Sequence, residues 1–175
     1  MIPVPANPAD AQWTNLAPGA KVSVSSTGNG SRNGINDRRV KMQLPYDNSQ
    51  KFWVSNSGNP TSQWVKLTFP VPVTVRTVRL YNIPSTDSSI KVLNATVRLF
   101  SDEAGTIQVA NQTSGSLSEN GTDVAFNNIR VKVVRIEFTS VNGSAAGLGE
   151  VEIIARGEDN IPNRIISGNV GVSGI

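Results

Sequence analysis

The side chains responsible for most enzyme chemistry are either missing from this sequence or spread along it. The 175 residues include no Cys and no His. This excludes a disulfide scaffold, a zinc, haem or iron–sulfur site with Cys or His ligands, a Cys nucleophile and any triad with a His base. A bound metal ion would need oxygen ligands, which favours calcium or magnesium.

Carboxylates are the remaining candidates for catalysis, because two of them can form a glycosidase pair. Asp102-Glu103 and Glu158-Asp159 have the composition of turns. Glu150 and Glu152 are two residues apart near the C-terminus, and we expect them not to line one site. We therefore expect no enzymatic activity.

The charge and hydropathy patterns exclude two further classes of partner. The net charge is only +3, and the longest basic run is Arg38-Arg39. Nucleic-acid binding would need a basic stripe with interleaved aromatic residues. No apolar stretch is long enough to span a bilayer. Residues 1–5 lack the features of a signal peptide, and a piece of a larger secreted protein would lack them as well. A surface rich in Ser, Thr, Asn and Gly with few charges is typical of bacterial extracellular β-proteins, so we predict an extracellular or cell-surface location.

Alternating polar and apolar residues predict the elements that must position any site. No segment has a sustained helical period, and about eight short strands with turn signals between them indicate an antiparallel sandwich or barrel. Pro70 and Pro72 are expected between two strands. The predicted strands are Lys21–Ser25, Gln63–Phe69, Val73–Asn82, Ala95–Asp102, Thr106–Gln112, Thr122–Phe126, Val131–Val141 and Gly149–Arg156.

The domain limits follow from changes in composition. Residues 1–14 are rich in Pro and Ala and are predicted to be a linker, residues 15–157 form the domain, and residues 158–175 are a second linker. The segment 165–175 resembles the first strand of a bacterial immunoglobulin-like repeat, although a frayed tail is the equal alternative. Residues 32–50 are long, polar and irregular, which is typical of a functional or ion-stabilised loop.

Several segments, taken in order, resemble the discoidin or coagulation-factor type C domains, which include the family-32 carbohydrate-binding modules. The resemblance implies an all-β, antiparallel jelly-roll sandwich of the galactose-binding-like type that binds a ligand and is not an enzyme. It lies in Asn15-Leu16-Ala17, Val22–Ser26, Ile35-Asn36-Asp37, Phe52–Ser55, Gln63–Phe69, Val73–Tyr81, Val134–Phe138 and Gly147–Ile153.

The resemblance also implies one structural calcium, because many family members hold one between the Asp-bearing loop and the closing Glu. An ion would also offset the ordering entropy of the long polar loop. The alternative is that the Asp caps a turn and the Glu pairs with an Arg. The implied ligands are the carboxylates of Asp37 and Glu150 and the backbone carbonyls of Gly34, Arg39 and Gly149.

A sugar site is implied less directly. Galactose-binding members commonly use a His and an aromatic residue, whereas this chain has no His and carries residues 144–147 (Ser-Ala-Ala-Gly) where the aromatic often lies. Two other loops would have to replace that site, and Arg side chains there suit acidic sugars. Solvated loop residues without a sugar partner are the alternative. The candidate ligand residues are Arg38, Arg39, Tyr46, Asp47 and Asn82.

Two of the three Trp residues, Trp53 and Trp64, are predicted to lie in the core, and Trp13 is predicted to pack on the sandwich wall or at a domain interface. Membrane insertion through Met42 and Leu44 is not expected. The sequence therefore predicts a carbohydrate-binding or adhesion module, beside other domains of a larger secreted bacterial protein. The alternative is a structural or protein-interaction sandwich that binds no sugar.

Overall fold

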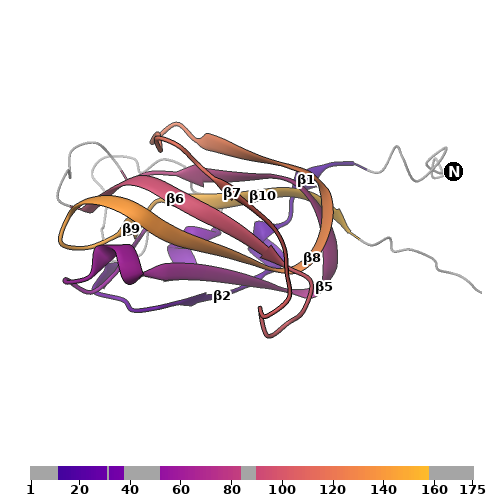
Figure 1. Cartoon of the computed structure of the whole chain (residues 1–175), viewed down its shortest axis with the longest axis horizontal. Helices are drawn as coiled ribbons and strands as arrows, with labels where there is room; N and C mark the ends of the chain where they lie inside the picture. The colour runs from indigo at the N-terminus through magenta and orange to yellow at the C-terminus, as the bar shows by residue number, and fades with distance from the viewer. Residues whose placement is uncertain (1–11, 31, 38–51, 84–89, 158–175) are drawn as a thin grey trace, which may run out of the picture.

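The computed structural model describes residues 12–30, 32–37, 52–83 and 90–157 (Figure 1). These ranges form strands joined by loops and three short 3-10 turns: η2 (Ala17–Gly19), η3 (Arg32–Ile35) and η4 (Pro60–Ser62). None of the described helical turns has the length and hydropathy of a membrane span. The strands are β1 (Thr14–Asn15), β2 (Lys21–Val24), β3 (Asn29–Gly30), β4 (Trp53–Val54), β5 (Trp64–Tyr81), β6 (Ile90–Phe100), β7 (Gln108–Thr113), β8 (Thr122–Gly143), β9 (Gly147–Leu148) and β10 (Glu150–Gly157).

Two long strands, β5 and β8, run through both layers of the sandwich. Their antiparallel ladder is in register up to Thr68, which pairs with Val133, and resumes where Val73 pairs with Val131. Pro70 lies in the gap, together with Pro72, and a proline has no backbone N–H to donate to a ladder. The prediction of separate strands on either side of the prolines was wrong, because the chain bends there and continues as one strand.

The bend divides the paired strands into two layers. In the first layer, the first half of β5 pairs with β2 and with the second half of β8. β8 pairs in turn with β6, and β6 pairs with β7. In the second layer, the second half of β5 pairs with the first half of β8 and with β10. The other edge of β10 pairs with β1. A small sheet of β3, β4 and β9 lies at the end of the sandwich opposite β1 (Figure 1). The predicted all-β antiparallel sandwich is therefore confirmed.

Alternate residues of both layers meet in one core. Trp53 is fully buried there, as predicted, and its ring stacks on Phe138 with centroids 5.7 Å apart. Its indole N–H donates to the backbone carbonyl of Ser26 at 2.8 Å. The prediction for Trp64 was wrong, because Val65 supplies the buried side chain and Trp64 points to the outer face of the first layer, where it is half-buried.

The two Trp residues should therefore differ in their effect on stability. We expect Trp53→Ala to lower the free energy of unfolding by about 3–5 kcal/mol, because it leaves a large cavity and an unpaired carbonyl. Trp64→Ala should cost only about 1 kcal/mol, since it removes surface contacts. Urea denaturation of both variants would measure the difference, and equal losses would contradict the outward position of Trp64.

Candidate functional site

The segment before Asp37 packs against β10. The turn η3 packs against β4 and β10, and β4 pairs with β9, which leads directly into Gly149 and Glu150. The amide of Asn36 donates to the backbone carbonyls of Ala17 at 2.8 Å and Ala20 at 3.1 Å. The fold therefore brings the two ends of the predicted calcium site into one region, the loop end of the sandwich.

Glu150 is the most unusual charged group in this region, because it is fully buried. A buried carboxylate requires a compensating cation or strong hydrogen-bond donors. Both a calcium ion and a basic side chain would supply this, and these are the two alternatives that the sequence left open. No three Asp or Glu residues gather within the described ranges. A calcium ion here would therefore depend on backbone carbonyls as well, which is compatible with its oxygen chemistry.

Gly149 lies beside this carboxylate at a close approach of two backbones, where a larger residue would be crowded. Its N–H donates to the carbonyl of Tyr81 at 2.9 Å. A Cβ atom at position 149 would lie only 3.0 Å from the carbonyl oxygen of Asn82. The start of β10 is thus held tightly against the end of β5, which fixes where the Glu150 carboxylate lies.

Asn82, predicted as a ligand residue, has a structural role in this fold. Its side chain is buried and its amide nitrogen donates to the carbonyl of Val92 at 2.6 Å. Its side-chain oxygen accepts from the N–H groups of Ile83 at 3.0 Å and Val92 at 3.3 Å. These bonds join the end of β5 to the start of β6, so the amide is occupied by the protein's own backbone.

The other predicted ligand residues, Arg38, Arg39, Tyr46 and Asp47, lie outside the described residues, as does the carbonyl of Arg39 proposed for calcium. The described frame next to the loop end is joined by hydrogen bonds between distant segments. Ser55 is buried, and its backbone N–H donates to the carbonyl of Ala146 at 2.8 Å while its hydroxyl accepts from the N–H of Ala146 at 3.0 Å.

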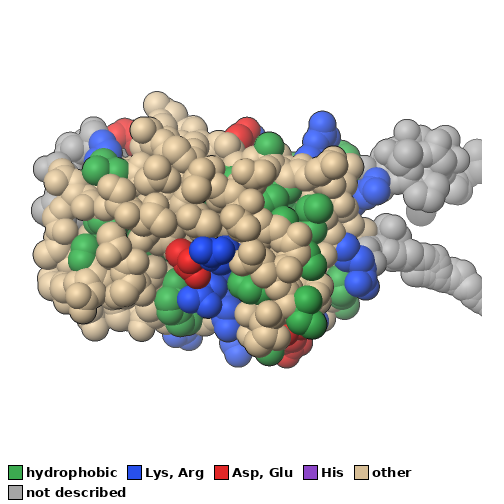
Figure 2. All heavy atoms as spheres, viewed as in Figure 1, with side chains coloured by type: hydrophobic (Ala, Val, Ile, Leu, Met, Phe, Trp, Pro, Cys, Tyr) green, Lys and Arg blue, Asp and Glu red, His purple; other side chains and the backbone are tan. Residues whose placement is uncertain are grey.

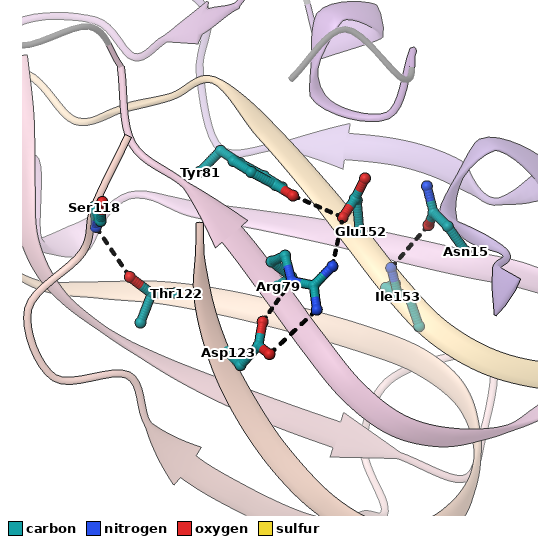
Figure 3. Close-up of polar contacts among 8 residues, drawn as sticks. All are labelled: Asn15, Arg79, Tyr81, Ser118, Thr122, Asp123, Glu152 and Ile153. Carbon is teal, nitrogen blue, oxygen red and sulfur yellow. Dashed lines mark hydrogen bonds and ion pairs between the residues drawn. The ribbon is translucent and has the colours of Figure 1, made fainter. Parts of the chain in front are cut away.

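A charged network on the outer face of the second layer was missed by the sequence reasoning (Figure 3). Arg79 pairs across the strands with both Asp123 and Glu152. Its guanidinium lies 3.2 Å from Asp123 Oδ2 and 3.2 Å from Glu152 Oε1. Tyr81 donates its hydroxyl to the same Glu152 oxygen at 2.9 Å. Only the strand register brings these four residues together, and the sequence does not display that register.

The electrostatics of this network suit structure better than proton transfer. The hydrogen bond from Arg79 lowers the pKa of Asp123, and it raises the pKa of the guanidinium itself. Burial raises the pKa of Tyr81, followed by its hydrogen bond to Glu152. The phenol therefore stays protonated, whereas a tyrosine base would need a lowered pKa.

Comparison with known proteins places this geometry in a family. Residues 15–154 match the model of one family, described as Domain of unknown function (DUF7402). The chain belongs to this family. No curated protein matches it in sequence.

Solved structures share the fold of this DUF7402 member at low sequence identity. A Streptococcus pneumoniae fucose-binding module is 20% identical with a TM-score of 0.67, over 81% of this chain and 95% of the module. The lectin domain of lectinolysin, complexed with Lewis b antigen, is 24% identical with a TM-score of 0.67, over 83% and 99%. The family-32 carbohydrate-binding module of NanJ from C. perfringens, complexed with galactose, is 14% identical with a TM-score of 0.63, over 80% and 97%. The predicted discoidin-type, galactose-binding-like fold is confirmed.

The Arg79–Asp123 pair should make stability depend on acid pH. Because the pKa of Asp123 is lower in the folded state, the pair stabilises the protein above the unfolded pKa of about 3.9, and this stabilisation is lost as the pH falls through the folded pKa. We expect Asp123→Asn to cost at most about 1 kcal/mol at pH 7, since both partners are more than a third exposed. The difference from the wild type, measured by urea denaturation, should shrink towards pH 2; a constant difference would contradict the assignment.

Proposed function

We propose that this domain is a non-catalytic carbohydrate-binding module with a structural calcium ion, and that it works within a larger secreted or cell-surface protein. The observation behind the proposal is the extent of the structural match. The chain covers 95–99% of a fucose-binding module and a lectin domain, so it corresponds to a whole module of that kind. Fold alone is an analogy for function, and the site residues therefore need a direct test.

Three features support binding at the loop end rather than catalysis. The described frame there consists of short strands and backbone hydrogen bonds, which hold the loops in place, and the Glu150 carboxylate beside them is fully buried and not open to a substrate. The Tyr81 phenol, which could have served as a base, lies on a sheet face and is kept protonated. The basic and aromatic candidates, Arg38, Arg39 and Tyr46, have the chemistry of sugar ligands: guanidinium forks for polar groups and a ring for the apolar face of a sugar.

Binding of glycans should depend on these loop residues. We expect the domain to retain a subset of glycans on an array in the presence of calcium, and calorimetry with a retained glycan to show at least a roughly tenfold loss of affinity in Arg38→Ala or Tyr46→Ala. Arg76→Gln is the matched control, since it removes one exposed Arg from β5. An array without any retained glycan would favour the alternative, a structural or protein-interaction module.

The burial of Glu150 supports calcium as the partner of the loop end. We expect calcium at 100 times its dissociation constant to stabilise the folded domain by about 2.7 kcal/mol, and chelator to remove this gain. Glu150→Gln and Asp37→Asn should abolish the calcium-dependent rise in melting temperature.

Glu103→Gln is the control for this experiment, because it neutralises a highly exposed carboxylate away from the loop end and should leave the rise intact. A wild-type melting temperature that is the same with calcium and with chelator would exclude the ion. It would favour pairing of Glu150 with a basic side chain.

A further inference from the structure

The outer face of the first layer has one aromatic ring bordered by two cations. Trp64 on β5 points outward, and its ring centroid lies 5.9 Å from Lys66 Nζ and 5.4 Å from the guanidinium carbon of Arg135. The register explains this grouping, because Lys66 pairs with Arg135 and Trp64 pairs with Glu137 across β5 and β8. Cations at these distances are attracted to the face of an indole ring.

Glu137 organises the cations of this face. Its Oε1 accepts a hydrogen bond from Arg98 Nε at 2.8 Å, and its Oε2 lies 3.0 Å from Arg135 Nε. Arg98 also donates from Nη1 to the side-chain oxygen of Gln108 at 3.1 Å. Glu137 therefore holds Arg98 by a hydrogen bond through Nε, whereas its contact with Arg135 Nε is an ion pair without a hydrogen bond. Among the described residues the Arg135 guanidinium forms no hydrogen bond, so its outer N–H groups are available to a ligand.

The cluster has more positive than negative charge. Two basic side chains, Arg98 and Arg135, pair with the single carboxylate of Glu137, and a third, Lys66, lies over the Trp64 ring. Among the described residues no carboxylate pairs with Lys66, and only Glu137 pairs with Arg135. We call Trp64, Lys66, Arg98, Arg135 and Glu137 the Trp64 cluster.

The Trp64 cluster is open to solvent but not fully hydrated. The side chains of Arg98, Arg135 and Glu137 are 34%, 36% and 28% exposed. Figure 2 shows basic and acidic side chains gathered near the middle of this face, with uncharged surface around them. Partial burial strengthens charge–charge interactions relative to bulk water, so an anion bound here would gain more than one at an isolated surface lysine.

We propose that the Trp64 cluster binds an acidic glycan. The anionic group of the glycan, a uronate carboxylate or a sulfate ester, lies between the outer N–H groups of Arg135 and the ammonium of Lys66. The sugar ring lies beside the exposed part of Trp64, and Glu137, whose oxygens keep lone pairs, accepts a hydrogen bond from a hydroxyl.

The chemistry of the cluster favours a sugar over other polyanions. A nucleic acid would place phosphates along a basic stripe, whereas here the cations form one compact group beside Glu137 and no stripe. A sugar offers both an anion for the cations and hydroxyl donors for Glu137. The proposal concerns a sheet face and not the loop end, so it does not rest on the function proposed above.

NMR titration would test the proposal on the folded domain. The three Trp residues give three indole N–H signals, and Trp64→Phe assigns the relevant one. The probes are oligogalacturonate against its methyl ester, and dextran sulfate against dextran. We expect the Trp64 signal to move with oligogalacturonate, dextran sulfate or both, and with neither neutral counterpart. The arm that responds identifies the anionic group.

Variants then separate a site from general attraction to a basic protein. We expect Lys66→Gln and Arg135→Gln each to weaken binding of the responding probe at least roughly tenfold. Arg76→Gln is the matched control, since it also removes a guanidinium stacked on a Trp ring, but from the other layer, and it should change affinity less than twofold. If Arg135→Gln does not fold, Lys66→Gln decides alone, because it breaks no ion pair.

Three results would overturn the proposal. The first is a Trp64 signal that stays in place with both acidic probes. The second is an equal loss of affinity in Arg76→Gln and Lys66→Gln. The third is a shift of the same size with polyglutamate or single-stranded DNA, which carry anions but lack a sugar ring with the required hydroxyls. Because mutation of Arg38 or Tyr46 should not affect the Trp64 signal, failure at the loop end would remain distinguishable from failure here.

Discussion

The bend shared by β5 and β8 is the constraint on which the structure depends. These two strands supply part of both layers, so the sandwich is one continuous ladder folded over itself. Pro70 and Pro72 lie where the ladder is interrupted, and there the missing N–H donors cost no hydrogen bond. Strict alternation along both halves then directs Val65, Leu67, Val75 and the residues like them into a single core.

This arrangement determines where function can reside. Inward-facing positions of the layers are occupied by buried apolar side chains, so polar chemistry is confined to the two outer faces and the two ends. On the outer faces, register alone sets which charges meet: it places Arg79 between two carboxylates, and Glu137 between two guanidinium groups. In the first network the single Arg is paired with two carboxylates. The second leaves cationic groups directed at solvent beside a Trp ring.

The sequence predicted the fold class well because period-two alternation is a local signal. The positions of β2 and β10, each within one residue of the prediction, follow from that signal. The continuity of β5 through Pro70 cannot be predicted from alternation, because a bend within one strand and a chain reversal between two strands look alike in sequence. Trp64 was predicted in the core because it lies in a strand, although its alternation with the buried Val65 assigns it to the outer face.

The site was harder to predict, because it depends on pairings between distant residues. Asn82 lies where a strand ends, and its amide could bind a ligand in a loop. In the structure that amide donates to the backbone carbonyl of Val92, ten residues further along the chain. Glu150 shows the opposite case. The resemblance implied it as a calcium ligand, and the fold buries its carboxylate completely. Burying a charge costs several kcal/mol unless it is compensated, so this residue is more informative about function than the exposed carboxylates, and the identity of its compensating partner determines how the loop end is held together.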